Sequence, residues 1–112
     1  MKPLVLKNAR IIDPSRDLDE TGTIIVEDGR IVAAGADAMN QGAPEGAEIV
    51  DCNGLVATPG LVDAHVFVGE PGAEHTETIR SASLAAAAGG ITSFVMMPDT
   101  QPPIDDVALL EF

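Results

Sequence analysis

Two apolar runs flank an alanine-rich segment in the second half of the chain, and this order restricts the fold more than any other feature. Residues 61–68 (LVDAHVFV) and 91–97 (ITSFVMM) are almost continuously apolar, which is typical of strands covered on both faces. Residues 76–90 (TETIRSASLAAAAGG) have the composition of a helix that packs closely against a sheet. A strand, a helix and a strand in this order predict a parallel pair joined by a right-handed crossover.

Capping residues mark the ends of the predicted helix. Thr76 is the expected N-cap, because its side-chain oxygen can accept a hydrogen bond from a free backbone N–H. Gly89 or Gly90 is expected to end the helix. A further helix is predicted to begin after the next loop, with Asp105 or Asp106 as its cap. Two parallel strands alone do not make a stable sheet, so this half is predicted to be the front part of a larger architecture.

Residues 1–58 have a different pattern, with short β-rich runs and tight turns. In the stretch TIIVEDGRIVAAG, two such runs flank Asp28-Gly29, a pair typical of two-residue hairpin turns. The stretch EIVDCNGLVATPG repeats this pattern around Asn53-Gly54, so the same reasoning predicts a second hairpin. We therefore expect a small antiparallel β unit in this part of the chain.

Charge and composition restrict the partners and the compartment. The net charge is −12 with only six lysines and arginines, so the chain lacks the basic surface that nucleic-acid binding requires. Such acidity favours solubility and would also suit a basic partner. No stretch approaches the roughly 20 apolar residues that span a bilayer, and the first ten residues lack a signal-peptide core. The single cysteine, Cys52, fits a reducing compartment and a buried position, so we expect a cytoplasmic protein.

Three residues at the end of the first apolar run suggest a metal site. Asp63, His65 and Phe67 are two apart, so their side chains are expected on one face of the strand. In a (β/α)8 barrel, the active site lies at this end of the strands. Two histidines here could bind one zinc ion, but Phe67 cannot coordinate a metal. A lone histidine at a strand end is more commonly a hydrogen-bonded residue than a ligand.

The stretch from residue 54 to residue 105 resembles the dihydroorotases of the amidohydrolase superfamily. The resemblance rests on Asp63, His65, the GEPG loop, the alanine-rich segment that ends in Gly-Gly, and the MPDT sequence. It implies a mixed fold, in which a β-sandwich portion (residues 1–58) precedes the first βαβ unit of an incomplete (β/α)8 barrel (residues 59–112). Such enzymes interconvert N-carbamoyl-aspartate and dihydroorotate in pyrimidine biosynthesis, and they use zinc to activate water.

Three positions depart from the family pattern. By resemblance, His65 is the first metal ligand, whereas Phe67 replaces the second. Gly69 replaces an arginine that holds the substrate carboxylate. Asp99 replaces an asparagine that contacts the same carboxylate, and two carboxylates repel each other. We therefore assign His65 to the metal position and Asp99 to the substrate position, and we expect zinc binding to be impaired.

Three hypotheses for function stay open. The first is a catalytically inactive dihydroorotase-like protein that has a structural role beside aspartate transcarbamoylase, in a homo- or hetero-oligomer. The second is an active zinc amidohydrolase whose other ligands lie beyond Phe112. The third is a cleaved or truncated piece with no function of its own, for which we expect weakly cooperative unfolding.

Two local alternatives concern the loop between the first strand and the helix. Glu70 could replace the missing zinc ligand, although its place in the sequence EPG favours a role in shaping the loop. His75 lies near Glu74 and Glu77, and these three could suggest a metal cluster. A solvated histidine beside a helix start explains the same residues more simply.

Overall fold

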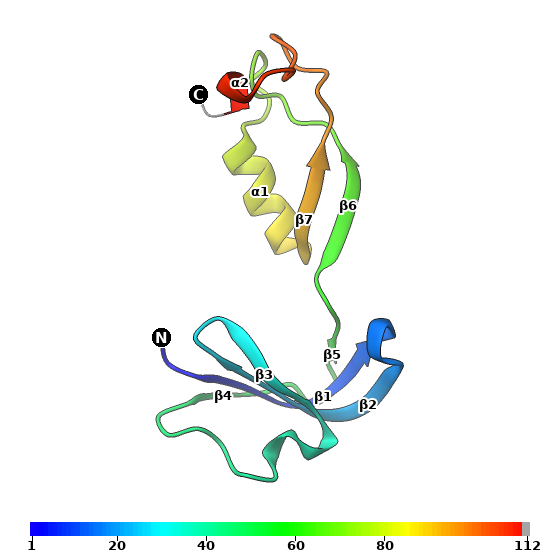
Figure 1. The fold of residues 1–112 in the computed structure, drawn as a ribbon, viewed down its shortest axis with the longest axis vertical. Coiled ribbons are helices and arrows are strands. Elements are labelled where there is room, and N and C mark those ends of the chain that lie inside the picture. Colours follow the sequence, from blue (N-terminus) through cyan, green and yellow to red (C-terminus); the bar gives the residue numbers. More distant parts are fainter. Residues whose placement is uncertain (111–112) are drawn as a thin grey trace. The chain divides into compact units, whose positions relative to one another are not determined.

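The computed structural model describes residues 1–110, and the chain divides into two compact units, Met1–Pro59 and Gly60–Phe112. The first unit is a five-stranded sheet, and the second contains two paired strands and a longer helix (Figure 1). The chain is therefore mixed and dominated by sheet. Within residues 1–110, no helix is long and apolar enough to cross a membrane.

Strand β1 (Leu4–Asp13) is the centre of the first unit. It pairs in antiparallel fashion with β2 (Leu18–Glu27), which pairs in the same way with β3 (Arg30–Gly35). On its other edge, β1 pairs in parallel with β4 (Glu48–Asp51) and, further along, with β5 (Val56–Ala57). One strand thus holds three partners, two of which come from the end of the unit. Short 3₁₀ turns follow β1 and β3, at Pro14–Arg16 and Ala36–Met39.

A bulge interrupts β1 at Asn8. The register with β2 shifts there, and Asn8 has a left-handed φ of 63°. Asparagine tolerates this conformation better than most residues do. Its side-chain amide donates a hydrogen bond to Oδ1 of Asp51, at the end of β4, over 2.9 Å. The bulge therefore ties the central strand to its parallel partner.

The core of the first unit forms around β1. Val5 is fully buried, and Ala9 and Ile11 are nearly so. Cys52 is buried against Ala9 and Ile11, as expected for a small apolar residue. Partly buried apolar side chains surround this cluster: Leu6, Leu18, Ile24 and Ala57.

One predicted hairpin is confirmed and the other is wrong. Asp28 and Gly29 both have positive φ, 48° and 75°, and the strands on either side pair in antiparallel fashion. Asn53 and Gly54 do form a turn, with a φ of 80° at the glycine. However, the strands around it, β4 and β5, each pair in parallel with β1 and not with each other. The sheet is therefore mixed and not antiparallel as predicted.

The second unit begins with a parallel strand pair. Strand β6 (Leu61–Val66) pairs with β7 (Ile91–Met96) in parallel, as the two apolar runs predict. Helix α1 (Ile79–Ala88) connects them and packs against β7 (Figure 1). A short helix, α2 (Val107–Leu110), closes the described part of the chain. The last residues of the helix predicted here, 111 and 112, lie outside the described residues.

The caps of these helices differ partly from the prediction. Thr78, not Thr76, is the N-cap of α1: its hydroxyl accepts a hydrogen bond from the Ser81 backbone N–H, and the Ser81 hydroxyl accepts one from Thr78. This reciprocal pair is a capping box. Gly89 ends α1 as predicted. At α2, the side chain of Asp106 accepts a hydrogen bond from the first turn, which confirms one of the two predicted caps.

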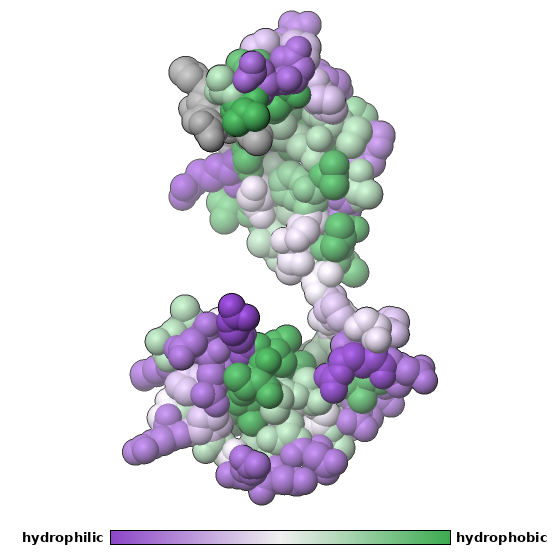
Figure 2. Space-filling model, in the orientation of Figure 1, coloured by the Kyte–Doolittle hydropathy of each residue, from purple (hydrophilic) through white to green (hydrophobic). Residues whose placement is uncertain are grey.

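Large apolar side chains are exposed on both units (Figure 2). Leu61 and Val62 are neighbours in β6 and point to opposite faces, yet they are 57% and 69% exposed. The composition predicted that both faces of these strands are covered. Residues 1–110 do not provide that cover. In the first unit, the exposed apolar residues include Ile31, Val32, Ile49, Val50, Leu55 and Val56.

Candidate functional site

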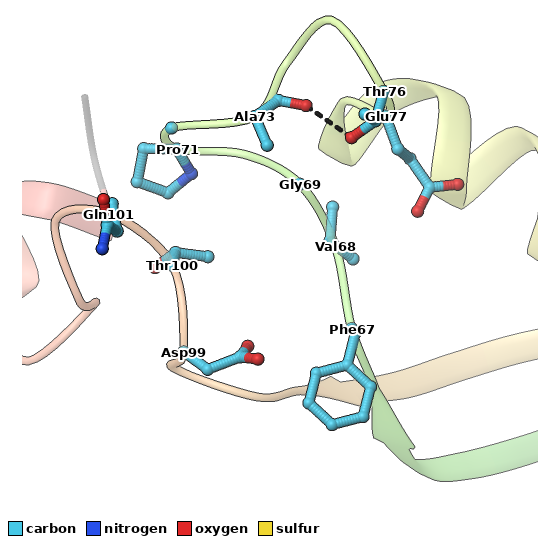
Figure 3. Close-up of a pocket in the computed structure, with 11 residues that line it drawn as sticks. Phe67, Val68, Gly69, Pro71, Ala73, Thr76, Glu77, Asp99, Thr100 and Gln101 are labelled. Atoms are coloured by element: carbon cyan, nitrogen blue, oxygen red, sulfur yellow. Dashed lines mark hydrogen bonds between the residues drawn. The ribbon is translucent and has the colours of Figure 1, made fainter.

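A hollow of about 610 Å³ lies where the loops after β6 and β7 meet (Figure 3). The two strands are parallel, so their carboxyl ends lie at the same edge of the pair. The hollow is lined by the segments 67–69, 71–73, 76–77 and 99–101. This edge is where the sequence predicted a site.

His65 and Phe67 lie side by side at the end of β6. Their ring centroids are 5.0 Å apart and the rings meet edge to face, at 69°. Phe67 is 59% exposed and lines the hollow, whereas His65 lies outside its lining. The Asp63 carboxylate accepts a hydrogen bond from the His65 backbone N–H at 3.0 Å. His65, the residue assigned to the metal position, thus contacts the phenyl ring of Phe67, where the family pattern has a second imidazole.

Asp99 lies opposite Phe67 across the hollow. Its carboxylate points toward the segment that carries Phe67 and Val68 (Figure 3). The residues that line the hollow include two titratable side chains, Asp99 and Glu77, and both are acidic. The structure thus brings Asp99 and Phe67 to one hollow, with no lysine or arginine in its described lining to balance the acidic side chains.

Gly69 lies at the point where the loop after β6 folds back. Its carbonyl oxygen accepts a hydrogen bond from the Ala73 backbone N–H at 2.5 Å. The hydroxyl of Thr76 in turn donates to the Ala73 carbonyl oxygen at 2.7 Å, which closes the loop (Figure 3). The position at which the resemblance implies an arginine is therefore enclosed by backbone.

Glu70 has a structural role in this loop. Its Oε2 accepts a hydrogen bond from the backbone N–H of Ile79, the first residue of α1, at 2.6 Å. Helix starts leave such N–H groups without partners inside the helix, and a carboxylate there is favourable. This bond supports the loop-shaping interpretation of Glu70 and occupies one oxygen of the carboxylate that could have served as a zinc ligand.

The residues around His75 form no metal cluster. Oε1 of Glu74 accepts a hydrogen bond from the Gly72 backbone N–H at 2.9 Å, and this bond is the main reason why the pKa of Glu74 is lowered. His75 itself is exposed. Across residues 1–110, no three histidine, cysteine, aspartate or glutamate side chains lie close enough to hold a metal ion. The described residues alone do not fit the zinc site that the resemblance implies.

One link between the two loops was not predicted. The Gln101 backbone N–H donates to the Pro71 carbonyl oxygen at 3.0 Å, and so joins the loop after β7 to the loop after β6. Thr100 is 6% exposed, and its hydroxyl donates to the Pro102 carbonyl oxygen at 2.9 Å. The signal in the sequence that could have indicated this contact was the position of two loops, each with proline, at the ends of paired parallel strands.

Comparisons with known proteins agree on one family. A family model described as dihydro-orotase-like matches residues 54–112. The chain is 48% identical over 106 residues to a dihydroorotase from Wolbachia sp. subsp. Brugia malayi, covering 94% of this chain and 24% of that protein. It is 46% identical over 108 residues to a dihydroorotase from Streptococcus pneumoniae, covering 96% of this chain and 25% of that protein.

A solved structure has a similar fold. The L-hydantoinase (dihydropyrimidinase) from Arthrobacter aurescens matches 99% of this chain and 24% of its own, with a TM-score of 0.79 and 30% sequence identity. The chain thus spans about a quarter of the length of the relatives that it matches.

Proposed function

Because this chain belongs to the dihydro-orotase-like family, we propose that it forms the front part of a cytoplasmic, dihydroorotase-like protein of pyrimidine biosynthesis that has lost its catalytic site. In this proposal, residues 1–58 contribute to a β-sandwich and residues 59–112 begin a (β/α)8 barrel. The exposure of Leu61 and Val62 supports a larger protein, since both faces of β6 carry apolar side chains that further strands or helices would cover.

The contact between His65 and Phe67 is the observation that carries the proposal. A phenyl ring offers no lone pair to a metal, and here it lies beside His65, the one imidazole that remains of the two in the family pattern. The substrate side is altered as well. Asp99 adds a negative charge to the hollow, where a substrate carboxylate would need a positive one.

We also propose a role that requires no catalysis, as a structural partner of aspartate transcarbamoylase. The scaffold residues of the family are present although the positions for metal and substrate are altered, and the chain's net charge of −12 suits a partner with a basic surface. An inactive homologue that retains its fold can still contribute surface to an oligomer.

The test uses the full-length parent protein, expressed and purified without chelators. Metal content is measured by mass spectrometry, turnover is measured in both directions with N-carbamoyl-aspartate and dihydroorotate, and co-purification with aspartate transcarbamoylase is measured from its own cells. The dihydroorotase from Streptococcus pneumoniae, prepared in the same way, is the positive control. We expect substoichiometric zinc, no turnover above background, and co-purification.

The alternative is an active zinc amidohydrolase whose further ligands come from outside residues 1–112. One observation favours it: the His65 side chain is exposed at the carboxyl end of β6, where it remains accessible to a metal. Stoichiometric zinc together with turnover of a cyclic amide would support this alternative and contradict the inactive protein.

A further inference from the structure

The loop of residues 69–77 closes tightly around Gly69. The Ala73 backbone N–H donates to the Gly69 carbonyl oxygen, and the Ala73 carbonyl oxygen accepts hydrogen bonds from both the backbone N–H and the hydroxyl of Thr76. The turn thus directs the Ala73 carbonyl oxygen back toward the α-carbon of Gly69. This loop forms one wall of the hollow.

A side chain at position 69 has no room in this arrangement. A β-carbon on Gly69 would lie 2.6 Å from the Ala73 carbonyl oxygen, 2.8 Å from Oγ1 of Thr76 and 2.9 Å from the Glu77 carbonyl oxygen. All three distances are shorter than β-carbons make in real structures, and two of the three atoms belong to the backbone. Gly69 does not have a left-handed φ. The restriction is therefore one of space and not of backbone conformation.

The loop cannot move aside without losing other contacts. On one side, Glu70 is bonded to the first backbone N–H of α1. On the other, the Pro71 carbonyl oxygen accepts the hydrogen bond from Gln101. A β-carbon on Gly72 would also collide with the Gln101 carbonyl oxygen, so this part of the loop lies directly on the loop after β7. Any side chain at position 69 must therefore disturb contacts on both sides of the loop.

We propose that Gly69 is a positioning residue that holds this loop closed, and that the loop in turn prevents a cationic side chain at position 69 from binding the carboxylate of a substrate. The inference rests on the proposed loss of function. It also explains why the two altered positions, 67 and 69, differ in whether the family's residue can be restored. Position 67 is open, since Phe67 is mostly exposed, and it can accept another side chain. Position 69 is closed, so restoring arginine there does not restore carboxylate binding.

The first test compares Gly69→Ala with Gly89→Ala in the full-length protein, by hydrogen–deuterium exchange and mass spectrometry. Gly89 is the matched control, because a β-carbon there would meet its nearest neighbours at 3.5 and 3.6 Å, in ordinary contact. In Gly69→Ala, we expect exchange in peptides covering residues 69–78 to accelerate at least about tenfold, with peptides from β1 unchanged. Gly89→Ala should leave residues 69–78 as protected as in the parent. Equal protection in Gly69→Ala and the parent would overturn the proposal.

A second test does not depend on how well Gly69→Ala folds. Affinity for N-carbamoyl-aspartate is measured by calorimetry for Phe67→His and for the double variant Phe67→His, Gly69→Arg. A single arginine–carboxylate pair in a suitable site would tighten binding at least about tenfold. We expect a gain of less than about twofold, because the Gly69→Arg side chain displaces the loop, and a displaced loop does not hold the guanidinium against the ligand. A tenfold gain would show that position 69 accommodates a carboxylate-binding arginine and would contradict the inference.

These results can be separated from a failure of the proposed function. Turnover by the unaltered protein would show that the site is active and would contradict the proposed function. The exchange of residues 69–78 in Gly69→Ala would still test whether Gly69 holds the loop closed. Conversely, an inactive protein whose loop tolerates Gly69→Ala would keep the proposed function and exclude the inference drawn from this loop.

Discussion

The carboxylate of Glu70 lies 2.6 Å from the backbone nitrogen of Ile79 and accepts its hydrogen bond. The two residues are nine positions apart in the chain, and the loop between them forms one wall of the hollow. The bond fixes the beginning of this loop to the start of α1, where the helix dipole favours a negative charge. It gives Glu70 a definite structural purpose and leads to the first prediction.

Replacing Glu70 should weaken the folded state without changing the metal content. Glu70→Ala removes the acceptor for the Ile79 N–H, and we expect the free energy of unfolding to fall by about 1–2 kcal/mol. Glu70→Gln keeps an acceptor oxygen and should lose less. Urea denaturation measures the stability of each variant, and mass spectrometry measures bound zinc. Loss of zinc in Glu70→Ala alone would instead assign Glu70 as a ligand.

Phe67→His should improve zinc binding. The rings of Phe67 and His65 are 5.0 Å apart at the strand end, so a second imidazole would stand beside the first. Since even the hydrogen-bonding partners of metal ligands change affinity by about 10–100-fold, we expect an added ligand to tighten zinc binding at least about tenfold. Competition with a chromophoric chelator measures it. Phe67→Leu, which adds no ligand, should bind zinc no better than the parent does.

Asp99→Asn should reduce repulsion of a dicarboxylate ligand. The Asp99 carboxylate points into the hollow, and one unfavourable charge pair near 4 Å in water amounts to about 1 kcal/mol. We therefore expect affinity for N-carbamoyl-aspartate to rise about fivefold. Calorimetry measures the change, with Asp105→Asn as a control outside the lining. An equal gain in the two variants would point to overall charge and not to this position.

Asp51 should contribute to stability in a pH-dependent way. Its pKa is lowered, chiefly because its side chain accepts a hydrogen bond from Asn8 and also from the backbone N–H of Asn53. A carboxyl group with a lowered folded-state pKa stabilises the fold fully above its unfolded pKa of about 3.9, and loses this effect as pH falls through the folded pKa. Asp51→Asn should therefore make the acid-side fall in Tm less steep. Thermal unfolding from pH about 6 to about 2.5 tests this. An unchanged slope would show that these hydrogen bonds do not form in solution.

Gly22→Ala should destabilise the first unit. Gly22 is buried in β2, and a β-carbon on it would collide with the backbone of Gly35 in β3. Overpacking of this kind costs about 1–3 kcal/mol. Gly89→Ala, which meets only ordinary contacts, should stay within about 0.5 kcal/mol of the parent. Chemical denaturation compares the two, and similar values would contradict the close approach of β2 and β3.

Local signals in the sequence predicted the parts of the fold that are determined locally. Asp28-Gly29 specifies a turn with two positive φ angles, and the strands beside it pair with each other. Asn53-Gly54 carries the same kind of signal and also forms a turn. Its strands pair instead with β1, far away in the chain, because a turn sets only the local direction of the backbone. Strand pairing over this separation has no local signature.

In the candidate site too, some features could be predicted from the sequence and others depend on the three-dimensional structure. The positions of His65 near the end of one parallel strand and of Asp99 after the other followed from the alternation of apolar runs and loops. The enclosure of Gly69 did not, because it depends on where the carbonyl oxygens of Ala73 and Glu77 lie in three dimensions. The cap that Glu70 provides for α1 was also not visible in the sequence, because it joins residues nine positions apart across a loop.

The central place of β1 has a consequence for how the protein is made. β1 leaves the ribosome before its parallel partners, β4 and β5, which follow at Glu48–Asp51 and Val56–Ala57. At about 5–20 residues per second, translation needs roughly 2 to 9 seconds to pass from the end of β1 to the end of β5. During this interval one edge of the nascent strand lacks its native partner and is open to pairing with other chains. The order of the strands thus makes the interval between the synthesis of β1 and that of β5 a stage at which this protein is exposed to aggregation.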